Sequence, residues 1–237
     1  MSDDQSQIDL ANCHSAVDTV MKERHSVRAF LPKSVSKAMV AAILETAAYS
    51  PSGTNIQPWQ VIVVAGDTRQ RLCERVLHAH YHEQGLHTAD WDIYPAAFVE
   101  PFLARRRKNG FDLYGLLGIA KGDKEAMNKQ FARNYTFFDA PVGLIFTIDR
   151  RLVRSSWLDY GMFMQNIMLA ARARGLDTCP QIAWSVFHQI ITEELQIPEQ
   201  QMVVCGMALG YADSTAVVNS LVTDREPLEK FVSFRGF

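Results

Sequence analysis

Apolar and polar positions alternate along the chain in ways that predict several helices. Residues 15–23 carry an apolar stripe at helical spacing, and Ser15 and Asp18 resemble a capping pair at its start. Ser36 is predicted to begin a second helix and Asp67 a third. In both, apolar side chains recur three or four residues apart, which places them on one helical face.

Runs of apolar residues predict three buried strands. Residues 61–64 read Val-Ile-Val-Val, and residues 140–149 and 202–211 are similarly apolar. Between the last two strands, residues 157–176 are apolar on most of the helical circumference, which predicts a buried helix that Gly175 ends. A further helix is expected before the last strand.

The order of these elements indicates an α+β fold, with a sheet covered by helices and no strict βαβ alternation. We expect one domain over residues 1–237, in which residues 1–14 form a flexible N-terminal arm. Residues 85–137 have a broken periodicity and predict a lid-like insertion of loops and short helices, because insertions of this length are usually functional. Residues 223–237 form an apolar tail that we expect to dock on another surface.

Composition and charge narrow the classes of function. The 24 basic and 26 acidic residues give a net charge of −2, which argues against a protein that binds nucleic acid or a membrane surface. No apolar run reaches the ~18 residues of a membrane helix, and the acidic N-terminus is unlike a signal peptide. The cysteines are scattered, which predicts reduced thiols in a cytoplasmic protein: Cys13, Cys73, Cys179 and Cys205.

A search for common catalytic and metal-binding motifs gives little support to a phosphate-loop, Rossmann, hydrolase or metal site. The chain has no G-x-x-x-x-G-K-S/T, G-x-G-x-x-G or G-x-S-x-G motif. His78, His80 and His82 invite a metal reading, but on a helix only His78 and His82 share a face, with Glu83 nearby. A polar helix face is the favoured explanation, and we predict no metal.

Two polar clusters are more informative. The loop at residues 50–59 is shaped by glycine and prolines, yet hydrogen-bonding side chains crowd it. Arg24, Ser26 and Arg28 lie two residues apart, so they point to the same side of an extended segment. Two guanidiniums and a hydroxyl can hold an anion such as a phosphate, and Arg225 can add a third cation.

The predicted lid supplies candidate substrate contacts. Its basic run, Arg105 to Lys108, is either a solvated face or an attractor of anionic substrates. Its aromatic side chains offer surface for a flat acceptor: Trp91, Tyr94, Phe111 and Tyr114.

In combination, the motifs resemble the FMN-dependent nitroreductase family, and most closely its nitrobenzoate-reductase-type branch. They are RHSVR at 24–28, SPSGTNIQPW at 50–59, APVGL at 140–144 and GLDTCPQIAW at 175–184. Their order and spacing match from about Val17 to the C-terminus. The resemblance implies a central, mostly antiparallel sheet and an intertwined homodimer with two FMN molecules at the subunit interface.

The resemblance also implies which residues hold FMN. One subunit provides Arg24, His25, Ser26, Arg28 and, near the phosphate, Arg225. The other subunit provides Pro51, Ser52, Gly53, Asn55 and Gln57. The loop that faces the flavin ring near N5 matches Pro180, Gln181, Ile182 and Ala183. Arg28 stands where many relatives have lysine, and Ile182 where some have an acidic residue.

The implied activity is the reduction of nitroaromatic or quinone-like acceptors with NAD(P)H, by a ping-pong mechanism and with non-covalent FMN. A small aromatic acceptor is the expected substrate, and Arg28 is expected to tune the flavin, with no catalytic acid or base assigned. The polar loop then has an explanation, because a flavin edge alternates donors and acceptors. Reductive dehalogenation, another flavin reaction of the family and a non-catalytic flavin-binding role remain open.

Overall fold

The computed structural model describes residues 10–237, and their side chains from residue 14 onward. The strands are β1 (Gln60–Ala65), β2 (Val142–Asp149), β3 (Asp177–Gln181) and β4 (Gln201–Gly210). The helices are α1 (Leu10–Glu23), α2 (Lys37–Ala47), α3 (Gly66–His82), α4 (Phe102–Leu116), α5 (Lys124–Ala132), α6 (Arg154–Arg172) and α7 (His188–Leu195). Short 3-10 turns are η1 (Gly53–Asn55), η2 (Arg133–Asp139), η3 (Ile182–Phe187), η4 (Val217–Ser220) and η5 (Leu228–Lys230).

The four strands form one sheet in the order β1-β2-β4-β3, and every neighbouring pair is antiparallel. The central strands β2 and β4 are buried along nearly their whole length, as their continuous apolar runs predict. The predicted α+β fold with an antiparallel sheet is therefore confirmed. The edge strand β3 was not predicted, because its sequence, DTCPQ, contains a proline and no apolar run.

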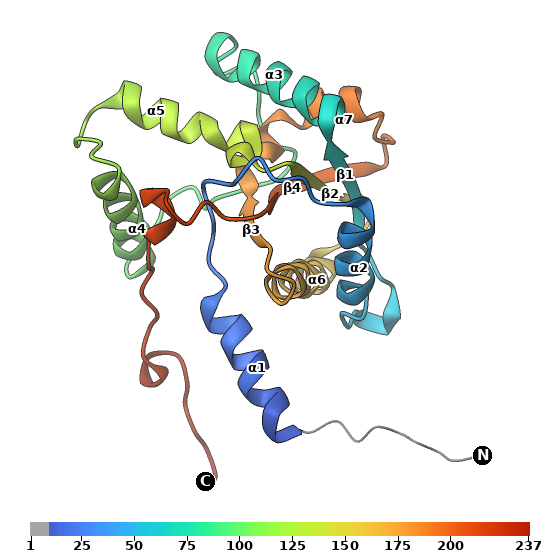
Figure 1. Cartoon of the computed structure of the whole chain (residues 1–237), viewed down its shortest axis with the longest axis vertical. Coiled ribbons are helices and arrows are strands. Elements are labelled where there is room, and N and C mark those ends of the chain that lie inside the picture. Colours follow the sequence, from blue (N-terminus) through green and yellow to red (C-terminus); the bar gives the residue numbers. More distant parts are fainter. Residues whose placement is uncertain (1–9) are drawn as a thin grey trace.

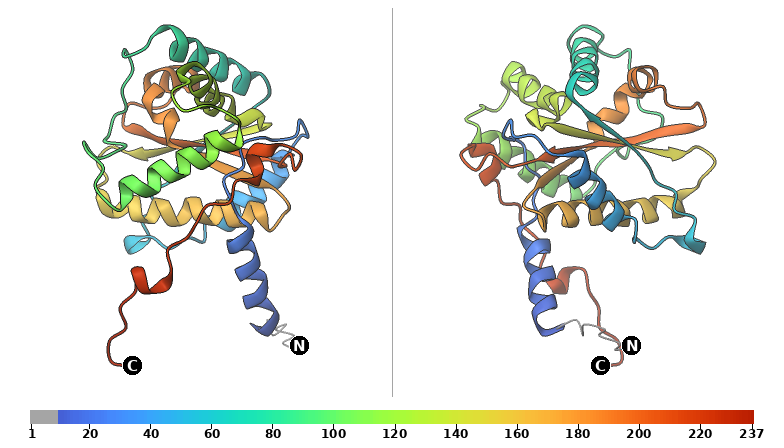
Figure 2. Two further views of the ribbon diagram at one scale, coloured as in Figure 1. Left: turned by 90° about the vertical axis from the view of Figure 1, so that its left-hand side faces the viewer. Right: turned by 45° about the vertical axis from the view of Figure 1, so that its right-hand side comes forward.

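Helices cover both faces of the sheet (Figures 1 and 2). On one face, α3 and α7 pack with the turns η2 and η3 around Tyr135, Phe137 and Trp184. On the other face, α2 and α6 pack around Phe146 and Phe163. Gly143 and Gly206 leave room for the rings of Phe137 and Trp184 to lie directly on the sheet, where a Cβ would collide with them.

The helix starts differ in part from the predictions. The cap predicted at Ser15 is wrong, because α1 already begins at Leu10 and Asp18 pairs with Lys22 at 3.0 Å inside the helix. Helix α1 therefore includes the last five residues of the predicted arm, and residues 1–9 lie outside the described part. The start of α2 is confirmed, since the Ser36 hydroxyl accepts from the Met39 N–H at 3.2 Å.

The insertion at residues 85–137 contains α4 and α5 joined by loops, as predicted. Its movement as a lid stays a prediction. Helix α1 and the C-terminal tail both project from one side of the body (Figure 1). Within the described residues, no helix combines the length and the hydropathy needed to cross a membrane.

Candidate functional site

Arg24 lies near Arg225 of the C-terminal tail, and Arg24 and Arg28 both lie near Cys179. We call these three arginines the cation cluster. Burial, and then the nearby charge of Arg225, lowers the pKa of Arg24. Within the described chain, none of the three guanidiniums forms an ion pair with a carboxylate. Like charges held together without carboxylates favour a bound anion.

The sheet edge fixes the segment that carries this cluster. Ser26 forms a parallel bridge with Thr178 of β3, and the Val27 N–H donates to the Thr178 carbonyl at 3.1 Å. The Arg28 N–H donates to the side chain of Asn219 at 2.7 Å, and the Arg28 Nη1 donates to the Ser26 carbonyl at 3.2 Å. The extended conformation predicted for Arg24, Ser26 and Arg28 is therefore held by β3 and η4.

Cys179 of β3 lies beside this segment. Burial raises the pKa of its thiol to about 11, which favours the neutral thiol at pH 7. Cys73 and Cys205 are likewise buried and free.

Residues 180–183, which are predicted to face N5 of the flavin, continue from the same edge strand, β3, that holds the segment with Arg24 and Arg28. Pro180 and Gln181 end β3, and Ile182 and Ala183 begin η3. The Gln181 side chain is buried, and its Nε2 donates to the Asn134 carbonyl at 2.7 Å. The Oε1 atom of Gln181 has no partner among the described residues, while Pro180, Ile182 and Ala183 are partly exposed.

The polar loop, residues 50–57, has an unusual backbone. Thr54, Asn55 and Gln57 have φ angles of 50°, 59° and 48°, in the left-handed region that non-glycine residues rarely adopt. Internal bonds support this shape, because the Gln57 N–H donates to the Ser52 hydroxyl at 3.0 Å. Pro51, Gly53, Asn55 and Gln57 are exposed in one chain, and Ser52 is partly exposed.

The polar loop and the extended segment that carries Arg24 and Arg28 lie at opposite ends of α6 (Figure 2). Near the start of α6, Asp159 accepts from the Gly53 N–H at 3.2 Å. At its end, Arg172 pairs with Glu23 at 2.9 Å and Asp177 at 3.2 Å, next to the cation cluster. Residues 159 and 172 are 13 positions apart, which at 1.5 Å per residue is about 20 Å along the axis. One chain therefore presents two separate half-sites.

The predicted aromatic substrate contacts differ in their surroundings. Trp91 is used in packing, because its ring lies 4.7 Å from that of Trp157 and its Nε1 donates to the Val203 carbonyl at 3.2 Å. Tyr94 lies under the Arg106 guanidinium, at 5.1 Å. Phe111 is exposed on α4, and Tyr114 is partly exposed.

The basic run of α4 points in several directions, because successive helical residues are rotated by about 100°. Arg105 pairs with Glu226 at 2.9 Å, and Lys108 pairs with Asp112 at 2.6 Å and Asp224 at 3.1 Å. The run therefore does not form one free positive face. Its role in acceptor binding stays a prediction.

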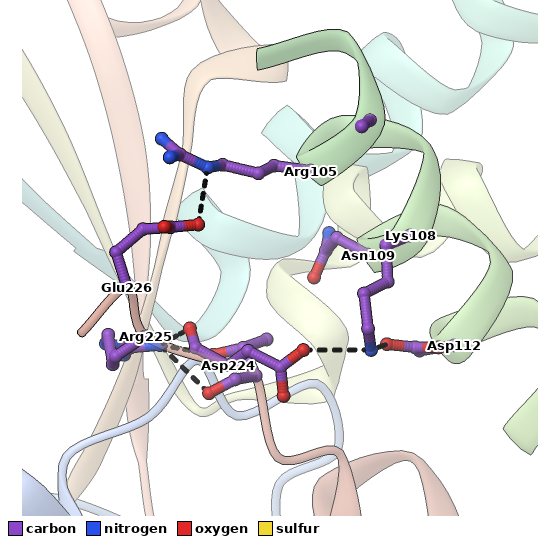
Figure 3. Close-up of a pocket in the computed structure, with 9 residues that line it drawn as sticks. Arg105, Lys108, Asn109, Asp112, Asp224, Arg225 and Glu226 are labelled. Atoms are coloured by element: carbon purple, nitrogen blue, oxygen red, sulfur yellow. Dashed lines mark hydrogen bonds and ion pairs between the residues drawn. The ribbon is translucent and has the colours of Figure 1, made fainter. Parts of the chain in front are cut away.

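A pocket of about 430 Å³ lies between α4 and the tail (Figure 3). Arg105 of α4 and Arg225 of the tail both line it, from opposite sides. The Arg225 Nη1 donates to the Thr223 hydroxyl at 2.7 Å and to the Asp224 carbonyl at 2.9 Å, which folds the guanidinium onto its own tail. The other N–H groups of Arg225 have no acceptor among the described residues, so they can donate to a bound anion.

The three histidines near the end of α3 lie on the helical faces that their spacing predicts. His78 and His82 share a face, with ring centroids 4.7 Å apart, while His80 bonds to Asn128 at 2.9 Å. Among residues 10–237, no group of three metal-ligating side chains is placed to hold a metal ion.

Comparison with known proteins agrees with this architecture. The model of the nitroreductase family matches residues 21–211. The chain is 40% identical to nitrobenzene nitroreductase of Ectopseudomonas oleovorans, over 92% of this chain and 96% of that protein. It is 42% identical to 4-nitrobenzoate reductase of Pseudomonas putida, over 93% and 96%.

Two solved structures are similar over most of their length. The FMN- and NADPH-dependent nitroreductase NfnB of Sphigopyxis sp. strain HMH superposes with a TM-score of 0.90 at 36% identity, covering 93% of this chain and 99% of that one. The FMN-dependent nitroreductase NfnB of Mycobacterium smegmatis, in complex with NADPH, also gives 0.90, at 32% identity and covering 94% and 99%. The chain therefore belongs to the nitroreductase family.

Proposed function

We propose that this protein is a nitroreductase that holds FMN non-covalently and reduces nitroaromatic acceptors with NADPH. The observation that carries the proposal is the cation cluster, in which Arg24 lies near Arg225, and Arg24 and Arg28 lie near Cys179, without carboxylate partners among the described residues. A phosphate group satisfies such a cluster through charge-assisted hydrogen bonds. NADPH is the donor named for both similar structures.

We propose further that the active form is a homodimer, in which each FMN is shared between two chains. The cation cluster and residues 180–183 come from one chain and the polar loop from the other, because the two half-sites of one chain lie at opposite ends of α6. Exposed apolar side chains on α6 support this assembly, with Leu158 73% and Met162 40% exposed. Burial of such a face contributes about 25 cal/mol per Å².

The projecting segments support the same assembly. Val17 and Met21 of α1 are exposed, as are Leu228, Phe231, Phe234 and Phe237 of the tail. Such apolar segments, extending from one body, are suited to wrap a second copy. The predicted intertwining of the tail is proposed on this basis.

Each group has a defined task in the proposed site. When bound, FMN supplies the two-electron chemistry between nicotinamide and acceptor. Arg24 and Arg225 bind the phosphate, and Ser26 adds a hydroxyl. Asn55 is suited to hydrogen-bond the flavin because its side-chain amide has no partner among the described residues. A backbone N–H of residues 181–183 would donate to the flavin ring.

The first expected result concerns turnover. One face of the ring can be reached by only one flat molecule at a time, since reacting atoms must approach within ~3–3.5 Å. NADPH alone should therefore bleach the yellow protein, and nitrobenzene or 4-nitrobenzoate should restore the colour. Initial velocities should give parallel double-reciprocal lines. Intersecting lines would show that both molecules bind together, and an unbleached flavoprotein would contradict the proposed activity.

Arg28 is expected to tune the flavin as well as to hold it. A cation at this position stabilises the negative charge gained on reduction, more strongly in a partly dry site than in water. Arg28→Met should lower the two-electron potential and slow reduction by NADPH, whereas Arg28→Lys should retain most of both. The potential can be measured against a reference dye. Lys33→Met is the matched control, since Lys33 lies over Tyr211 at 3.7 Å. Equal potentials in wild type and Arg28→Met would remove this role.

A further inference from the structure

Four side chains of α6 hold the segment that contains the polar loop, and we call them the α6 clamp. They come from two turns of the helix, where residues 159, 163 and 166 share a face. The Asn166 Nδ2 donates to the Ser50 hydroxyl at 2.6 Å, and Asp159 accepts from the Gly53 N–H at 3.2 Å. The Phe163 ring stacks on Trp59 at 4.6 Å, and the Tyr160 hydroxyl donates to the Gln60 carbonyl at 2.8 Å.

Asp159 has a special place in the clamp. Among the described residues, it provides the one side chain from outside the loop that bonds to the backbone of residues 52–57. Its side chain is buried, with the residue 7% exposed, and it forms no ion pair with a cation of the described chain. Burial of a carboxylate without a cation costs desolvation free energy, so we infer that a specific hydrogen bond accounts for its presence.

The loop needs such an anchor because of its backbone. Thr54, Asn55 and Gln57 all hold left-handed φ angles, which non-glycine residues keep only where surrounding contacts impose them. The Asp159 bond fixes the turn directly before these three residues. Without it, the Gly53 N–H loses its acceptor, and Asn55 and Gln57 can relax toward commoner conformations.

We propose that Asp159 is a positioning residue that holds the polar loop in the shape that FMN requires. This inference rests on the proposed function, and it assigns to α6 a role in cofactor binding besides packing. The acceptor oxygen, and not the negative charge, is the feature that the loop uses. A loop fixed before binding loses less conformational freedom when the cofactor arrives, which tightens binding.

The test compares FMN binding to apoproteins of wild type, Asp159→Ala and Asp159→Asn, by quenching of flavin fluorescence. We expect at least tenfold weaker binding for Asp159→Ala. Asp159→Asn should stay within about threefold, because its amide oxygen can still accept from Gly53. The visible circular dichroism of the bound flavin should change in the alanine variant and not in the asparagine variant. A purely structural role would lower the melting temperature and leave this spectrum unchanged.

Ser156→Ala is the matched control, because Ser156 is buried on the same helix and has no hydrogen bond to the loop among the described residues. It should bind FMN as wild type does. If Asp159→Ala does not fold, Asp159→Ser replaces it, since the shorter side chain leaves Gly53 unpaired. If the alanine or serine variant bound FMN as tightly as wild type, this inference would be overturned while the proposed function would stand. FMN binding by Asp159→Asn as weak as that of Asp159→Ala would also overturn it. A wild-type protein that binds no FMN would overturn the proposed function and this inference with it.

Discussion

Replacing Arg24 and Arg225 together by alanine is expected to strip most of the FMN from the purified protein. Charge-assisted hydrogen bonds contribute ~1.5–3 kcal/mol each, and every ~1.4 kcal/mol is a tenfold change in affinity. Loss of both cations should therefore weaken FMN binding by at least about a hundredfold. The flavin content can be measured from the visible spectrum, and the released cofactor identified by chromatography.

The same variant should not lose stability as apoprotein. Burial and Arg225 lower the pKa of Arg24 in the folded state, so folding disfavours the charged form of this group. Removing the two charges should therefore leave the melting temperature of the apoprotein unchanged or raise it. The loss of cofactor would then come from the site and not from unfolding.

A matched control removes two arginines that do have carboxylate partners. Arg71 and Arg75 of α3 pair with Glu194 at 3.2 and 3.1 Å, and Arg75 also pairs with Glu193 at 2.6 Å. Arg71→Ala with Arg75→Ala changes the net charge equally and should keep the FMN. Full retention of FMN by the Arg24 and Arg225 variant, or recovery of FAD from the wild type, would contradict the proposed phosphate site.

Local pattern predicted the centre of the fold and missed its edge. Strands β2 and β4 are buried on both faces, which requires continuous apolar runs that are visible in the sequence. Strand β3 lies at the edge and follows α6 directly, and its pairing with β4 is decided by tertiary packing. Residues 157–176 predict a buried helix, yet Leu158 and Met162 of α6 are exposed in one chain.

The candidate site was predictable where its residues are neighbours in sequence. Arg24, Ser26 and Arg28 share a side because extended backbone alternates its side chains, and β3 keeps that segment extended. The residues that position these groups are distant in sequence. Asp159 and Gly53 are 106 positions apart, and Arg28 and Asn219 are 191 apart, so no local sequence pattern predicts either contact.

The basic run of α4 shows how helix geometry divides a cluster of charges. Its sequence is compatible with a solvated face or with a positive surface that attracts an anionic acceptor. In a helix, consecutive residues turn away from one another, and acidic residues of α4 and the tail pair with Arg105 and Lys108. Charges two residues apart therefore share a side in an extended segment, whereas consecutive charges in a helix spread around its circumference.

The central claim is that each FMN is held by the cation cluster of one chain and the polar loop of another. Mixed dimers can test it with two defective chains. The first chain carries Arg24→Ala and Arg225→Ala. The second carries Asn55→Gly and Gln57→Gly, which remove both side chains while glycine accommodates the left-handed backbone. Each variant alone should form dimers with little FMN.

The decisive measurement is the FMN content of the mixed dimer, purified through a different affinity tag on each chain. In a shared site, the intact cluster of the second chain meets the intact loop of the first, so one of two sites is complete. We therefore predict about one FMN per mixed dimer, together with recovery of NADPH-driven nitrobenzene reduction. If each site is built within one chain, every site of the mixed dimer has a defect. A mixed dimer as poor in FMN as its two parents would contradict the shared site.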